Sequence, residues 1–146
     1  MGFLGTPAGI PADVNLVLQI AILCVLILSR SHAKKKIYAK HGRYMAIAVA
    51  LNATALAVVM LPSLLSGLSF IETNPTNLLS IIEIIHAVLG TTSLILGVYL
   101  VAKWRFSKSF VECFKNKDLM NPTTVIWATT AVIGIILYIE LYVAAF

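Results

Sequence analysis

The sequence predicts an all-α integral membrane protein, a four-helix bundle whose N- and C-termini lie outside and whose two basic loops are cytoplasmic. Two observations carry this prediction. The chain of 146 residues is 60% hydrophobic and only 12% charged, whereas about 25% of the residues of a typical soluble domain are charged. All 11 lysines and arginines lie in two short segments, 30–43 and 103–117, between long apolar runs. This distribution follows the positive-inside rule and predicts one transmembrane domain, residues 1–146, in the cell membrane.

Four apolar runs are each long enough to cross a hydrocarbon core of about 30 Å as a helix. Asp13 lies near the outer start of the first run, and Pro62 predicts a kink near the outer end of the second. A polar outer turn precedes the third run, and Asn121-Pro122 opens the fourth. We expect the spans at about residues 10–29, 44–68, 78–102 and 123–146.

Several classes of protein are excluded by the same features. The net charge of +5 does not indicate a nucleic-acid partner, because the basic residues are confined to two loops between spans. No nucleophile–base set, phosphate loop or complete metal set is present, so we predict no enzyme and no cofactor bound by this chain alone. Cys24 falls in mid-membrane and Cys113 in an inner loop, so they cannot form a disulfide.

Ionisable residues at membrane depth are functional candidates, because burying them there is costly. Glu83 and His86 share one face of the third span, and Glu140 lies at a similar depth on the fourth, with Asn15 and Gln19 near that level on the first. Glu-x-x-His is the ligand spacing of carboxylate-bridged metal proteins, which need it twice and two further Glu. Four interpretations of this cluster stay open. The first is a metal site of Glu83, His86 and Glu140, and the second is a protonated carboxyl group that hydrogen-bonds across helices beside a neutral His86. The others are contact with a partner subunit or its cofactor, and simple hydration of Glu140.

A haem clamped by two histidines requires both axial ligands at one depth. His41 lies at the inner mouth of the second span, whereas His86 lies in the outer half of the third. The two are about 20 Å apart along the membrane normal by helix rise, so they cannot hold one haem together. His32 is near His41, but both belong to a lysine-rich connector, which is typical of a solvated loop.

Three segments carry a family resemblance. They are His41-Gly42-Arg43-Tyr44-Met45, Ile85-His86-Ala87, and the run from Asn121-Pro122 through Trp127 and Tyr138 to Leu141-Tyr142. Over residues 35–143 the chain resembles the CtaM/YozB-like group of small four-helix membrane proteins, which has been tied to maturation of haem–copper cytochrome oxidase. The resemblance implies that His41 and His86 contact a cofactor, a metal or haem, within a complex.

The chain also departs from the pattern of that group. A third histidine of the group falls near Asn116-Lys117 here, and neither residue is a histidine. Glu83 and Glu140 stand where the group usually has apolar residues, so the outer polar cluster is an addition. Such exchanges indicate a chain reassigned to a stable partner.

We therefore predict a non-catalytic small subunit or assembly factor of a larger membrane metalloenzyme complex of respiration or energy metabolism. A haem–copper oxidase and a copper membrane monooxygenase are both open as the host. The expected partners are the lipid bilayer and other membrane subunits. The alternatives are a metal- or haem-binding redox protein that uses the outer Glu/His cluster, and a pathway for protons or small solutes.

Overall fold

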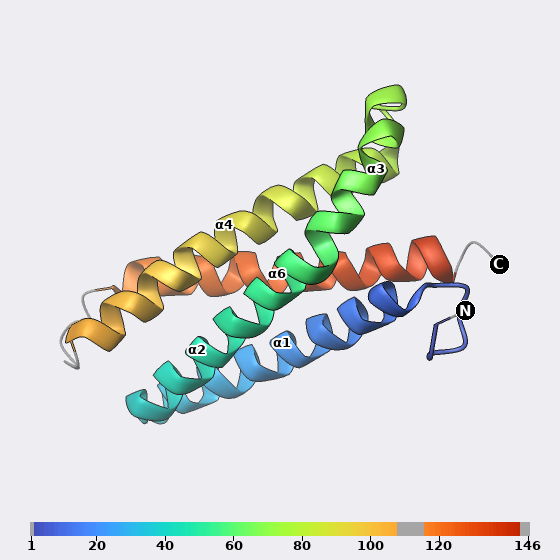
Figure 1. Ribbon diagram of the computed structural model, residues 1–146. Helices are drawn as coiled ribbons and strands as arrows, with labels where there is room; N and C mark the ends of the chain where they lie inside the picture. The colour runs from blue at the N-terminus through green and yellow to red at the C-terminus, as the bar shows by residue number, and fades with distance from the viewer. Residues whose placement is uncertain (1, 108–115, 144–146) are drawn as a thin grey trace.

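The computed structural model describes residues 2–107 and 116–143 and shows a bundle of long helices (Figure 1). A helix suits a chain in lipid because it satisfies its backbone hydrogen bonds within one segment. The elements are α1 (Ile10–Lys34), α2 (Tyr38–Ala55), a π-helical turn η1 (Leu56–Met60), α3 (Leu61–Thr73), α4 (Leu78–Ser107) and α6 (Lys117–Tyr142).

The prediction of four apolar helices long enough to cross a membrane is confirmed, with α2, η1 and α3 forming one continuous span. The helices are longer than the spans expected from hydropathy. Hydropathy marks only the apolar part of a helix, whereas Ala, Lys and Arg at its ends are good helix formers and extend it. The four apolar helices are Ile10–Lys34, Tyr38–Thr73, Leu78–Arg105 and Lys117–Tyr142.

The spans pack so that α1 contacts α2 and α6, and α4 contacts α6 and α2. Gly97 of α4 permits one of these close approaches, because a Cβ there would lie 2.9 Å from the ring of Trp127 on α6. The apolar core is therefore built from interlocked large and small residues, as helix packing in membranes requires. Its buried cluster comprises Ile22, Leu26, Met45, Ala48 and Trp127.

The second span changes direction just before Pro62. Proline has no N–H to bond the carbonyl four residues earlier, here that of Val58, and the turn η1 that contains Val58 is π-helical. Beyond this turn α3 diverges from α1 and α6 (Figure 1), and α3 has no buried residue. The interruption predicted at Pro62 is thus a widened turn, and it leaves α3 without a packed face.

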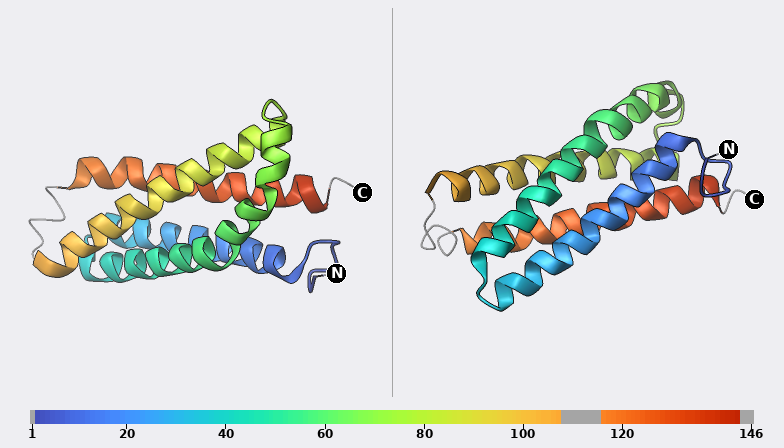
Figure 2. Two further views of the ribbon diagram at one scale, coloured as in Figure 1. Left: turned by 45° about the horizontal axis from the view of Figure 1, so that its top comes forward. Right: turned by 60° about the horizontal axis from the view of Figure 1, so that its bottom comes forward.

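The two ends of the bundle differ in composition. The start of α1 and the end of α6 lie together (Figure 2), and the hydroxyls of Thr6 and Tyr138 are 2.8 Å apart. We call this the terminal end. The α1–α2 turn, the end of α4 and the start of α6 form the opposite end, which we call the basic end because both Lys/Arg-rich segments reach it.

Candidate functional site

A cavity of about 790 Å³, which we call the lateral groove, lies where α3 diverges from the bundle. Its walls are the start of α1, the turn η1, the first turns of α3, the segment of α4 from Glu83 to Thr91, and the end of α6 from Gly134. Sites for small molecules have volumes of about 300–1,000 Å³ and are mostly apolar with a few polar groups. The groove has this character, since most of its lining residues are apolar.

Three polar side chains from the predicted outer cluster line the groove: Glu83, His86 and Asn15. His86 is only 7% exposed. Its ring packs against Gly134 of α6, where a Cβ would lie 2.9 Å from His86 Cε1 and 3.4 Å from the Cδ of Gln19. The structure therefore brings together α1 and α4 side chains that the sequence placed at one depth, and they meet beside Gly134 of α6.

Two of these groups each have one buried atom without a hydrogen-bond partner among the described residues. His86 bonds to the backbone of Thr130, but its Nδ1 has no hydrogen-bond partner among the described residues, and neither has Asn15 Oδ1. A buried polar atom without a partner costs about 1–3 kcal/mol. Because most buried polar atoms are satisfied, two unpartnered acceptor atoms make the lateral groove a candidate binding site.

Glu140, by contrast, is exposed and does not line the groove. The structure does not bring Glu83, His86 and Glu140 together as a ligand set. Within residues 2–107 and 116–143, no group of three His, Cys, Asp or Glu side chains is placed to hold a metal ion. The polar cluster that the sequence predicted thus consists of amide, imidazole and one carboxyl group.

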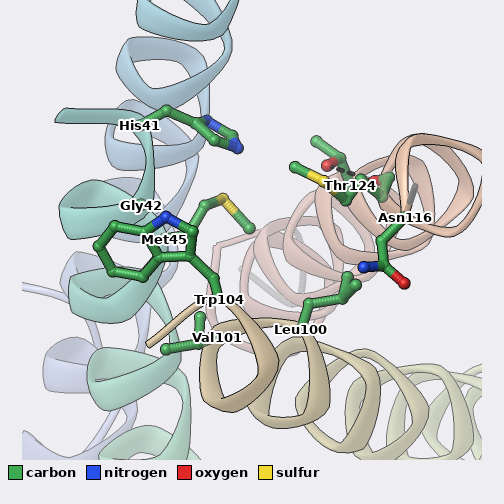
Figure 3. Close-up of a pocket in the computed structure, with 9 residues that line it drawn as sticks. His41, Gly42, Met45, Leu100, Val101, Trp104, Asn116 and Thr124 are labelled. Atoms are coloured by element: carbon green, nitrogen blue, oxygen red, sulfur yellow. Dashed lines mark hydrogen bonds between the residues drawn. The ribbon is translucent and has the colours of Figure 1, made fainter. Parts of the chain in front are cut away.

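The other candidate histidine lies in a different cavity. His41 of α2 is buried and lines a small cavity of about 40 Å³ near the basic end, which we call the basic-end pocket. Figure 3 shows His41 and Met45 extending into this space from α2, with Trp104 of α4 beside Gly42. A Cβ at Gly42 would lie 2.5 Å from the Trp104 ring, so glycine is required there. His41 and His86 share no cavity and do not form one haem site.

A polar network at the terminal end had no predicted role. Asp13 is fully buried and accepts hydrogen bonds from Tyr138 Oη (2.6 Å), the Leu4 backbone N–H (2.9 Å) and Thr6 Oγ1 (3.5 Å). The network ties the N-terminal segment and α1 to α6. The one signal for it in the sequence is that Asp13 is the only acidic residue of the first apolar run.

Comparison with known proteins leaves the family open. No family model, no curated protein and no solved structure matches the chain. The resemblance to the CtaM/YozB-like group therefore stays a prediction.

Proposed function

We propose that this protein is a non-catalytic small subunit or assembly factor of a larger membrane metalloenzyme complex, and that a transmembrane helix of that complex docks in the lateral groove. The observation that carries the proposal is the groove itself, an open cavity of about 790 Å³ whose lining includes polar groups. Lipid tails cannot hydrogen-bond to those groups, whereas a protein segment can.

The chemistry of the groove specifies the partner. Asn15 Oδ1 is a hydrogen-bond acceptor. In a neutral His86 whose other ring nitrogen bonds to the Thr130 backbone, the unpartnered Nδ1 atom is also an acceptor. The docking helix should therefore present hydrogen-bond donors, such as hydroxyl or amide groups, on an otherwise apolar face. Glu83, which is half-buried, also lines the groove and can bond to the same helix.

The exposed face of α3 supports the same partner. Leu61 and Leu65 of α3 are 50% and 60% exposed, and both belong to a helix with no buried residue. Helices in lipid associate through close packing and interhelical hydrogen bonds. A docked helix would pack against α3 on one side and reach the polar groups that line the groove on the other.

The orientation and the host are also part of the proposal. We place the basic end in the cytoplasm, because every lysine and arginine lies in the two segments that reach it. The groove then opens in the outer half of the bilayer. The resemblance to the oxidase-maturation group supports a haem–copper oxidase as the host, and a copper membrane monooxygenase is the second candidate.

Native electrophoresis after mild detergent extraction tests the proposal. We expect the full-length chain to co-migrate with one metal-containing membrane complex, and the double variant His86→Phe/Glu83→Leu to release it. The matched control Glu140→Leu changes an exposed carboxyl outside the groove and should leave the complex intact. A chain that migrates alone in every gentle condition would contradict the proposal.

A further inference from the structure

The imidazole of His41 is held in one orientation by Ser29 of α1. His41 Nδ1 lies 3.0 Å from the Ser29 carbonyl oxygen and 2.7 Å from Ser29 Oγ, while Ser29 Oγ donates to the His41 carbonyl at 3.2 Å. A carbonyl oxygen can only accept, so the Nδ1 atom carries the hydrogen. In the neutral ring, Nε2 is then an unprotonated acceptor.

This Nε2 atom is buried and has no hydrogen-bond partner among the described residues. Histidines that bind metals usually donate their other ring N–H to a carbonyl or carboxylate, which fixes the tautomer and the direction of the lone pair. The Ser29–His41 pair has this arrangement. The Nε2 atom is therefore oriented as a metal ligand would be, and no described residue donates a hydrogen bond to it.

Two thioethers line the same pocket. Met45 is one helical turn after His41 on α2, and Met120 belongs to α6. The chain has only four methionines, and two of them line this cavity of about 40 Å³. Met45 is itself buried, so its sulfur lies in an apolar and water-poor setting.

We propose that the basic-end pocket binds a single Cu(I) ion through His41 Nε2 and the sulfur atoms of Met45 and Met120. Thioether and imidazole ligands favour Cu(I), whereas Zn²⁺ is usually held by thiolate, imidazole and carboxylate groups. A cavity needs about 10–15 Å³ to hold one water molecule, so this pocket accommodates an ion and excludes a haem. The site is independent of the lateral groove, with which it shares no residue.

A second cavity of about 330 Å³ provides access from the basic end. It shares His41, Met45 and Met120 with the pocket, and Arg30, Lys34 and Lys117 also line it. Such a basic surface repels a free cation but attracts anions. The ion would therefore arrive as an anionic Cu(I)–thiolate complex and pass to His41, Met45 and Met120 by ligand exchange, in which copper stays Cu(I) and the thiolates dissociate.

Competition with the anionic chelator bicinchoninate tests the site under anaerobic reducing conditions. The full-length protein, purified in detergent with a tag that contains no histidine or methionine, should remove one Cu(I) equivalent per chain from the coloured chelator complex. Met45→Leu and Met120→Leu preserve side-chain volume and hydrophobicity, so the fold should persist. Each should weaken Cu(I) binding at least about tenfold, and X-ray absorption should show sulfur ligands that the double variant lacks.

Met60→Leu is the matched control, since Met60 lies in η1 and lines the lateral groove instead. It should bind Cu(I) as the unchanged protein does. The proposal is overturned if the unchanged protein takes no Cu(I) from the chelator. It is equally overturned if the folded Met45→Leu/Met120→Leu variant binds as tightly, or if Met60→Leu weakens binding to the same degree.

Discussion

At the scale of single residues, two buried polar side chains in the terminal half of the bundle differ in how well their hydrogen-bonding atoms are satisfied. Asp13 has three donors, from Tyr138, Thr6 and the Leu4 backbone. His86 has one ring nitrogen without a partner in the described part of the chain. Sequence alone marks both as polar residues in apolar runs and cannot separate them, because partners come from other segments of the chain. The structure shows that Asp13 joins the N-terminal segment and α1 to α6, whereas a binding role for His86 is our proposal.

Replacement of Asp13 by alanine should lower the thermal stability of the protein in detergent. The change leaves the hydroxyl of Tyr138 and the N–H of Leu4 without their common acceptor at a buried site. Asp118→Ala is the control, because Asp118 is an exposed carboxyl in the first turn of α6. Circular dichroism melting should show a drop of several degrees for Asp13→Ala alone. Equal melting temperatures for the two variants would contradict the structural role of Asp13.

At the scale of elements, the apolar runs predicted the four helices, but not how they separate. The π-helical turn at Leu56–Met60 arises from the missing N–H of Pro62 and from the packing of its neighbours, which a hydropathy pattern does not record. A hydropathy pattern likewise does not say which glycine faces which side chain. Gly134 against His86 and Gly97 against Trp127 emerge only from the folded chain.

Gly134→Ala and Gly67→Ala form a matched pair that tests this packing. A Cβ at Gly134 would lie 2.9 Å from His86 Cε1, whereas one at Gly67 of α3 would lie 4.0 Å from Glu83 Oε2, an ordinary contact. Gly134→Ala should therefore reduce the free energy of unfolding by about 1–3 kcal/mol. Gly67→Ala should be neutral or stabilising by up to about 1 kcal/mol, since alanine favours the helix.

A double-mutant cycle separates crowding from other causes. In a His86→Ala background the imidazole is gone, and Gly134→Ala should then cost much less stability. The unfolding free energy can be followed by titration with denaturing detergent. If Gly134→Ala destabilised the protein equally in both backgrounds, the contact between Gly134 and His86 would not be its cause.

At the scale of the whole molecule, charge and hydropathy predicted the class of fold, while the lateral groove was not predictable. The groove depends on the divergence of α3 from α6, two elements far apart in the sequence (Figure 1). The outer polar cluster was predicted by depth, and the structure retains Asn15, Glu83 and His86 along the groove but leaves Glu140 on the surface. The depth of a residue in the membrane follows from helix rise, whereas the direction in which its side chain points depends on how the helices rotate against one another.

The distribution of charge predicts which end of the molecule faces the cytoplasm. In a Cys24→Ser/Cys113→Ser background, Thr76→Cys lies in the turn between α3 and α4, and Lys36→Cys lies in the turn between α1 and α2. A membrane-impermeant maleimide should label Thr76→Cys in intact cells and label Lys36→Cys only after permeabilisation. The reverse pattern would invert the proposed topology.

The central claim is that a partner helix occupies the lateral groove, and site-specific photo-crosslinking in native membranes tests it most directly. A photoreactive residue in place of Ala87 would lie in the groove, and one in place of Ile95, two turns further along α4, would lie on an exposed surface outside it. We predict that Ala87 crosslinks to one transmembrane subunit of a metal-containing complex, and that Ile95 does not. Crosslinks from Ala87 to lipid alone, or the same products from both positions, would contradict this account.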